Sequence, residues 1–254
     1  MKPFWTGISG SGLKILAVCS MLTDHIGQIV LKNGIALNAS RSLFTDAEFS
    51  ALLSLIEVCH IVGRIAFPIF CFLLTEGFVH TRRPGIYLRN LMVFAVVSEP
   101  LYDLAFAGTL LNAGAQNVLF ELSLGLLVLM VLQKSGTSPV LQVAITLAGA
   151  VLAFMLRLDG GYYGILLIVL FDRFRSRPGL KFPAAVLTMY LCGLDFSPAG
   201  FIDPYFLAAA SALVWIAAYN GRRGRQIKYF FYAFYPAHLL LLSACASCIV
   251  HVLL

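Results

Sequence analysis

Long apolar runs without a polar face constrain this chain more than any other feature of its sequence. The runs Leu122–Leu132, Val140–Leu156 and Leu239–Leu254 lack the polar stripe that a helix on the surface of a soluble protein needs. Of the 254 residues, 60% are hydrophobic and only 12% are charged. A membrane-spanning helix needs about 20 mostly apolar residues, so the chain has room for roughly nine such helices and for no soluble domain.

We therefore expect an all-α, polytopic transmembrane bundle that forms one membrane-embedded domain over residues 1–254. The first apolar run, Leu13–Leu31, is too long for the core of a usual signal peptide and predicts a retained helix. The segments 161–172 and 182–194 are short, and they fit a tilted or re-entrant helix as well as a full span. The expected helices lie near 13–31, 51–79, 86–107, 117–133, 139–157, 161–172, 182–194, 204–219 and 229–251.

The basic residues fall into alternate loops. If nine helices alternate in direction, the arginine-rich loops 80–90, 172–181 and 221–228 all face the same side. The other side receives only Lys32, Arg41 and Arg157. The positive-inside rule then predicts a cytoplasmic N-terminus and a C-terminus outside. The net charge of +6 is thus explained by topology and gives no reason to expect a nucleic-acid partner.

The six cysteines all lie in apolar stretches, which is typical of small buried residues and not of a disulfide framework. Cys245, Cys248 and His251 are spaced i, i+3, i+6 near the C-terminus. One stripe on one helix is a weak metal signal, and we expect no metal site.

Five ionisable residues from four predicted helices are expected at one depth, about 15 Å into the membrane. They are Asp24, His25, Arg64, Glu99 and His238. One interpretation is structural, with Asp24 or Glu99 paired with Arg64 to hold the bundle together. The other is an acid–base site, because intramembrane ionisable groups usually mark function and a neutral imidazole accepts protons near physiological pH.

Three prolines accompany this layer. Pro68 and Pro236 lack the N–H groups that would bond the carbonyls of Arg64 and Tyr232, and Pro100 follows Glu99 directly. Broken backbone hydrogen bonds at membrane depth are tolerated where they face protein or a cavity. With the charges, the prolines favour a polar cavity inside the bundle.

Three segments resemble motifs of the TraX family of bacterial membrane proteins. They are Leu22-Thr-Asp-His-Ile-Gly27, Gly63-Arg-Ile-Ala-Phe-Pro-Ile-Phe70 and Phe231-Tyr-Ala-Phe-Tyr-Pro-Ala-His238. This resemblance covers nearly the whole chain and implies a multi-pass acetyltransferase of the bacterial inner membrane. The family's named member acetylates the N-terminus of conjugative pilin, and the family is similar to membrane acyltransferases that use cytoplasmic acetyl-CoA. Asp24, His25, Arg64 and His238 occupy motif positions, and Glu99 follows the same pattern.

The resemblance leads to a mechanistic hypothesis. Acetyl-CoA would be the donor, with its phosphates bound by Arg82, Arg83, Arg222, Arg223 and Arg225. His25, oriented by Asp24, would be the general base, and Arg64 would hold the thioester carbonyl or its oxyanion. His238 would be a second base or a transient acyl carrier. A peptide N-terminus, a glycan hydroxyl and a lipid head group all suit a histidine base as acceptors.

Two other functions remain open from the sequence. A proton-coupled secondary transporter would also use intramembrane aspartate, glutamate and histidine residues, although it explains the basic loops less well. A structural subunit of a larger complex would leave the ionisable layer without a role.

Overall fold

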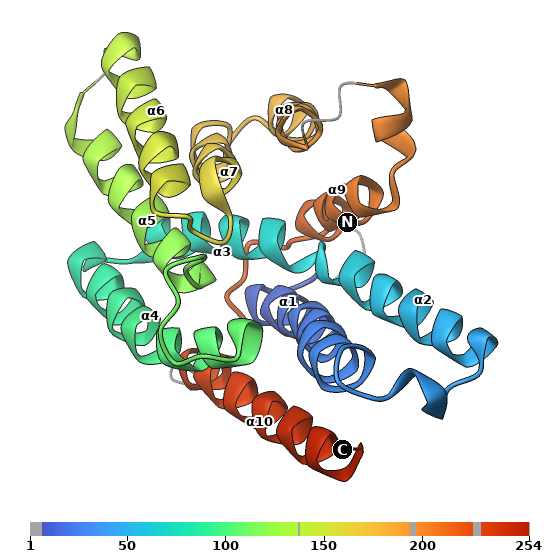
Figure 1. Cartoon of the computed structure of the whole chain (residues 1–254). Helices are drawn as coiled ribbons and strands as arrows, with labels where there is room; N and C mark the ends of the chain where they lie inside the picture. Colours follow the sequence, from blue (N-terminus) through green and yellow to red (C-terminus); the bar gives the residue numbers. More distant parts are fainter. Residues whose placement is uncertain (1–6, 137, 194–196, 226–229, 254) are drawn as a thin grey trace.

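The computed structural model describes residues 7–136, 138–193, 197–225 and 230–253, and its extended regular elements are all helices (Figure 1). The all-α bundle predicted from the sequence is confirmed. The α-helices are α1 Gly10–His25, α2 Asp46–Gly63, α3 Ala66–His80, α4 Pro84–Ala107, α5 Val118–Lys134, α6 Pro139–Met155, α7 Gly161–Arg173, α8 Pro178–Cys192, α9 Pro204–Ala217 and α10 Phe230–Leu253. A π-helix, η1 Ile26–Ala36, continues α1, and two short 3-10 helices are η2 Arg41–Leu43 and η3 Pro198–Ile202.

The predicted helix 51–79 is two helices in the structure, α2 and α3, and this prediction of one continuous helix was wrong. The backbone breaks at Arg64 and Ile65, whose N–H groups bond carbonyls only three residues back, at 3.1 Å and 3.3 Å. Pro68 has no N–H to offer the Arg64 carbonyl, which removes the next bond of the ladder. The other predicted spans agree with the structure to within a few residues, and the predicted ends at 194 and 229 lie outside the described residues.

Local capping signals explain most helix starts. The Ser9 side chain caps α1, Asn117 caps α5 and Asp203 caps α9, each accepting a hydrogen bond from a backbone N–H of the first turn. Thr45 and Glu48 form a capping box at the start of α2. Proline occupies the first turn of α4, α6, α8 and α9, where its missing N–H has no helical partner in any case.

The outward faces of the bundle require lipid. Within the described residues, four helical stretches are long and apolar enough to cross a membrane: Gly10–Ala36, Asp46–His80, Pro84–Ala107 and Phe231–His251. Large apolar side chains on α4 and α6, among them Val96, Val143 and Val151, are more than half exposed. No soluble protein displays such faces to water, so the chain is a membrane protein.

The buried core joins the first, third, seventh and last α-helices. Leu13 of α1, Ile69 of α3, Leu167 of α7 and Leu239 of α10 have no exposed surface. Helix α1 packs against α2 and α3, while α10 packs against η1 and α4 (Figure 1). This arrangement brings residues near 25, 60, 100 and 238 to the middle of one bundle, although they come from distant parts of the chain.

Candidate active site

Two predicted site residues, His25 and His238, form a buried pair. The His25 Nδ1 and His238 Nε2 atoms are 2.7 Å apart, and the rings stack with centroids 4.9 Å apart. The exposed fractions are 7% for His25 and 4% for His238. The first helix and the last helix therefore meet through a direct imidazole–imidazole hydrogen bond, as their common predicted depth suggests.

The partners of this pair determine where its protons lie. His238 Nδ1 is 2.9 Å from the Phe234 carbonyl oxygen, which can only accept a hydrogen bond. His238 Nδ1 must therefore carry a proton, and the Nε2 of neutral His238 accepts one from His25 Nδ1. In this tautomer the Nε2 atom of His25 keeps its lone pair, so His25 is the member of the pair that can act as a base or nucleophile.

Aromatic rings enclose the pair. Phe106 contacts His25 edge-on at a centroid distance of 5.3 Å, and Phe234 stacks on His238 at 4.8 Å. Tyr235 packs edge-on against both imidazoles, at 6.3 Å from His25 and 5.4 Å from His238. The Tyr235 hydroxyl meets the backbone N–H of Val118 at the start of α5. Because that N–H can only donate, the hydroxyl proton of Tyr235 remains available to another acceptor.

Asp24 does not orient His25, and this part of the mechanistic hypothesis was wrong. The Asp24 Oδ1 atom lies 2.8 Å from Nδ1 of His60 on α2. Adjacent residues on an α-helix point about 100° apart, so Asp24 and His25 serve different faces of α1. His25 turns toward α10, and Asp24 turns toward α2.

A glycine sets the spacing between Asp24 and His60. A Cβ atom built on Gly63 would lie 2.5 Å from the Asp24 Cβ, a distance that no real pair of side chains adopts. Gly63 therefore allows α1 and α2 to approach closely enough for the carboxylate to reach the imidazole one turn earlier on α2.

Arg64 lies in the break between α2 and α3. Its guanidinium lies over the Tyr205 ring, 5.5 Å from the centroid, and interacts electrostatically with Asp159. Asp159 lies in the connection between α6 and α7. Asp159 is exposed; the Asp24 carboxylate raises its pKa, while the Arg64 guanidinium lowers it. Asp24, His60, Arg64 and Asp159 thus form one charged group, which we call the Asp24 cluster.

Glu99 joins the site from α4 through Asn117. The Asn117 backbone N–H donates to Glu99 Oε2 at 3.1 Å, and the Asn117 side chain donates both to that oxygen and to the Ala95 carbonyl. Glu99 also interacts electrostatically with Tyr235. The structure therefore brings Glu99 to the Tyr235 side of the site, and it does not pair Glu99 with Arg64.

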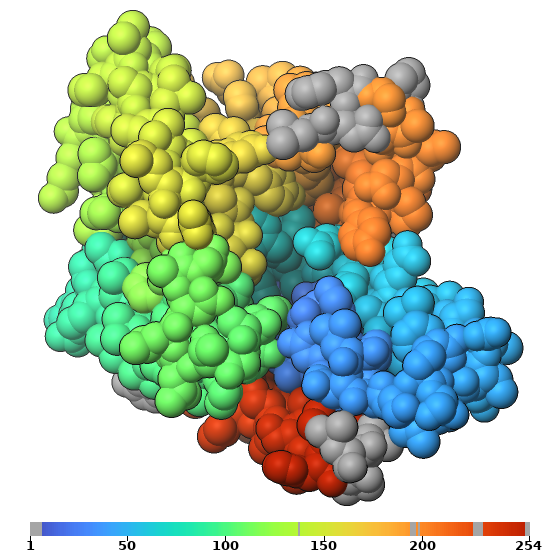
Figure 2. Space-filling model, in the orientation of Figure 1, coloured from blue at the N-terminus to red at the C-terminus, as the bar shows by residue number. Residues whose placement is uncertain are grey.

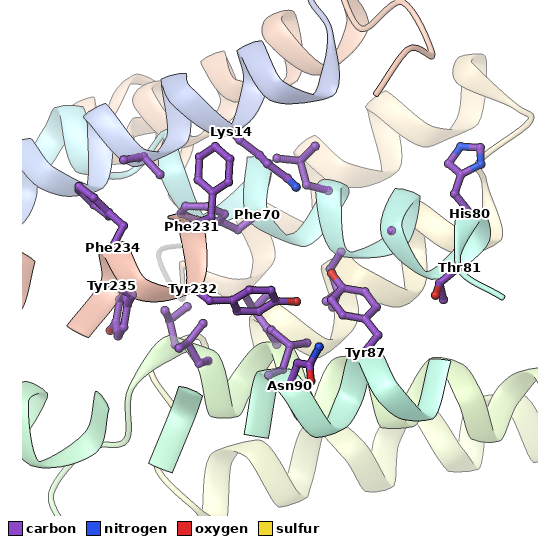
Figure 3. A pocket seen from close by; sticks show the side chains of 18 of the residues that line it. Lys14, Phe70, His80, Thr81, Tyr87, Asn90, Phe231, Tyr232, Phe234 and Tyr235 are labelled. Carbon is purple, nitrogen blue, oxygen red and sulfur yellow. The ribbon is translucent and has the colours of Figure 1, made fainter. Parts of the chain in front are cut away.

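A cavity of about 580 Å³ ends at Phe234 and Tyr235, which pack against the histidine pair, although neither histidine lines it (Figure 3). His80 and Thr81 lie at one end of it, and Phe234 and Tyr235 lie at the other. Arg82, Arg83 and Arg223 also line it, together with Lys14, while Phe70, Tyr87 and Tyr232 form aromatic walls. We call it the basic pocket, because its mouth is cationic and its deep end reaches Tyr235.

Two of the five arginines expected to bind the donor do not line the basic pocket. Arg222 and Arg225 lie beside it on the connection that precedes α10, where the backbone of Arg222 binds Gly10. Lys14 takes a place that the sequence analysis did not give it, with its ammonium 5.3 Å from the centroid of the Phe231 ring.

A second cavity of about 440 Å³ lies among α7, α8 and α9. Tyr163 and Tyr205 line it, and so does Gly160 beside Asp159. Because Tyr205 also carries the Arg64 guanidinium, this cavity adjoins the Asp24 cluster. Figure 2 shows the recess in this face of the molecule, between the α7–α9 side and helices α1 and α2.

His60 and Glu121 are the functional candidates that the sequence analysis missed. His60 and Arg64 are spaced i, i+4, so they share a helix face, and this spacing was the available signal. Glu121 is fully buried, and neither of its carboxyl oxygens bonds a described residue. Across the described ranges, no three His, Cys, Asp or Glu side chains gather in a way that could hold a metal.

Comparison with known proteins supports the family resemblance of the three sequence motifs. The family model described as TraX protein matches residues 9–245. The chain is 28% identical over 256 residues to a probable fimbrial assembly protein FimC, serogroup H1, of Dichelobacter nodosus, covering 91% of this chain and 93% of that protein. No solved structure matches. With its first, second and last helical motifs all inside the matched region, the chain belongs to the TraX protein family.

Proposed function

We propose that this protein is an integral membrane acetyltransferase that moves an acetyl group from acetyl-CoA to an amine or hydroxyl acceptor. The observation that carries the proposal is the basic pocket, whose cationic mouth and whose deep end at Phe234 and Tyr235, next to the histidine pair, suit the two ends of one extended thioester. Its volume falls within the usual range for small-molecule sites, about 300–1,000 Å³. Because one relative is described as a probable fimbrial assembly protein, we choose a peptide as the acceptor to test first.

The mouth of the pocket suits the phosphates of coenzyme A. Arg82, Arg83, Arg223 and Lys14 line the pocket and supply guanidinium and ammonium donors. The aromatic walls, including Tyr87 and Tyr232, suit the adenine ring and the largely apolar pantetheine arm. On the topology predicted from the basic loops, this mouth faces the cytoplasm, where acetyl-CoA is made.

His25 is the proposed base at the deep end. Its Nε2 lone pair takes the proton of the attacking acceptor as the new bond to the acetyl carbon forms. The same proton then passes to the departing coenzyme A sulfur. His238 and the Phe234 carbonyl fix the tautomer, a role that carboxylates play in other triads. The Tyr235 hydroxyl is placed to donate to the carbonyl oxygen as negative charge develops there.

Arg64 has a different proposed place from the one expected. It contacts Tyr205 and does not line the basic pocket, so a role on the thioester carbonyl has no support from its position. We assign Arg64 to the acceptor side, next to the second cavity.

Acetyl transfer by the purified protein tests this function. The protein in nanodiscs is incubated with acetyl-CoA and a short peptide with a free N-terminus, and both coenzyme A release and acetyl-peptide are measured. His25→Ala is expected to abolish both signals, while His251→Ala, at the exposed end of α10, is expected to behave as wild type. Full activity of the His25→Ala protein would contradict the assignment.

A proton-coupled transporter is the second candidate, and Glu121 is the observation that favours it. A buried carboxyl group without a hydrogen-bond partner among the described residues is typical of a proton carrier in membrane transport. Proteoliposomes separate the two functions. Solute uptake driven by a proton gradient, without release of coenzyme A, would favour the transporter.

A further inference from the structure

The Asp24–His60 pair has the geometry of a second acid–base site. His60 Nδ1 lies 2.8 Å from a carboxylate oxygen, the arrangement that orients an imidazole and stabilises its protonated form. Its Nε2 atom makes no hydrogen bond to any described residue. The side chains of His60 and Asp24 are 17% and 26% exposed, respectively, so neither is sealed inside the protein. The mechanism above makes no use of this pair.

The two histidine sites differ in how deeply their side chains are buried. His25 is buried against His238 and the rings of Phe106 and Tyr235, so a proton taken up by His25 is not released directly and moves on to the sulfur. His60 is partly exposed, and Arg64 and Asp159 are exposed as well. One base is thus suited to recycling a proton within the reaction and the other to releasing one.

An amine acceptor requires both kinds of base. At neutral pH an aliphatic amine is mainly an ammonium ion, which has no lone pair with which to attack. It must lose one proton before the carbon–nitrogen bond forms and a second proton as that bond forms. A hydroxyl acceptor loses only one.

We propose that His60, held by Asp24, is a catalytic residue that takes the first proton from a protonated amine acceptor entering beside Arg64 and Asp159. Asp24 is its positioning residue. The free amine then attacks the acetyl carbon, the bond from carbon to sulfur breaks, and the second proton passes through His25 to the sulfur. The products are the amide, coenzyme A and one proton, which His60 releases to solvent. This inference rests on the proposed acetyltransferase function.

The charges around His60 suit a cationic ligand. Asp24 approaches from α1, and Asp159 interacts with Asp24 from the connection before α7. On the helix of His60 itself, Cys59 interacts with Asp24, Glu57 is exposed one turn earlier, and Arg64 follows one turn later. On η1, the Lys32 ammonium donates a hydrogen bond to the Gln28 side chain. On α9, the Tyr205 ring contacts the Arg64 guanidinium. The two aspartates outweigh the one arginine next to the pair.

A pH series with two amine probes tests the proposal. The first probe is a peptide with a free α-amino group, whose pKa is about 7.7–8.0, and the second is an aromatic amine that is uncharged at neutral pH. For each probe, kcat/KM is measured for wild type and for His60→Gln, and the ratio of the two is followed with pH. Taking the ratio removes the titration of all groups that the two proteins share.

For the peptide, the kcat/KM of wild type is expected to exceed that of His60→Gln about tenfold at pH 6.7, because about one-tenth of the α-amino groups are uncharged there. This ratio is expected to fall toward one near pH 9. The ratio for the aromatic amine is expected to stay near one throughout. Asp24→Asn should reproduce the shape of the peptide curve with a smaller ratio, and His251→Ala should give a ratio of one. Asp24→Asn also tests the idea independently of any folding defect caused by the change at His60.

A peptide ratio that does not change with pH would overturn the proposal, because a merely structural role lowers activity equally at every pH. A ratio of one at every pH would overturn it too. If wild type acetylates neither probe, it is the acetyltransferase function that fails. If wild type acetylates both and the ratio is flat, only the role of His60 fails.

Discussion

The imidazoles of His25 and His238 are joined by a hydrogen bond of 2.7 Å between Nδ1 of the first and Nε2 of the second. The Phe234 carbonyl fixes the outer proton of this pair, and the available lone pair is therefore on His25. On the proposed function, the two histidines have different roles: His25 is the reacting base, and His238 orients it.

Removing His238 should lower the rate without preventing donor binding. In His238→Ala the His25 Nδ1 proton loses its acceptor, so the reactive tautomer is no longer favoured. We expect kcat to fall by about 10²–10⁴-fold, the usual contribution of a positioned acid–base group. The KM for acetyl-CoA should change little, because the cationic mouth is untouched, and an unchanged kcat would contradict the role of His238.

The mouth of the basic pocket should control donor affinity. Arg83→Gln removes one exposed cation next to the proposed phosphate site, so KM for acetyl-CoA should rise by about three- to tenfold with kcat nearly unchanged. The effect should weaken as salt concentration increases. Lys134→Gln, at the end of α5, is the matched control. Lys134→Gln is expected to keep the wild-type KM. If Arg83→Gln also kept the wild-type KM, the donor would not bind at this mouth.

Gly63 should not tolerate a larger residue. A Cβ atom at this position would lie 2.5 Å from that of Asp24, so Gly63→Ala must push α1 and α2 apart. We expect a loss of about 1–3 kcal/mol of stability, together with loss of the Asp24–His60 hydrogen bond. Thermal unfolding in detergent measures the first effect. Gly179→Ala, where nothing lies within 4 Å of the added carbon, should be neutral.

The helical bundle and much of the site were predictable from the sequence because they depend on local properties. Apolar run length gave the helices, and counting from the basic loops placed His25 and His238 at one depth. The partner of Asp24 was not predictable in this way. It depends on the rotation of α1 relative to α2, which the Gly63 contact fixes and which no periodicity reveals.

The break at Arg64 shows the same limit. Pro68 indicated a weakened helix. The residues on both sides of it are apolar, however, so the sequence pattern does not distinguish one kinked helix from two separate helices. The role of Glu121 was also hidden, since its position near a helix start looks like an ordinary acidic first turn. In the structure, Phe67, Gly160 and Gly164 pack around the Glu121 side chain.

The predicted orientation has its own test. The positive-inside rule places the C-terminus outside, so alkaline phosphatase fused after residue 254 should be active, and a fluorescent protein that matures only in the cytoplasm should stay dark. The same pair of reporters inserted in the 172–181 loop should give the opposite result. A fluorescent C-terminal fusion would reverse the orientation and move the basic pocket to the outer face.

The most direct test of the central claim is a cryo-EM structure of the protein in nanodiscs with an unreactive thioether analogue of acetyl-CoA. We predict phosphate density beside Arg82, Arg83 and Arg223, and the acetyl mimic within hydrogen-bonding reach of Tyr235 and next to His25 Nε2. An analogue that bound elsewhere, or a basic pocket that stayed empty at saturating concentration, would contradict it.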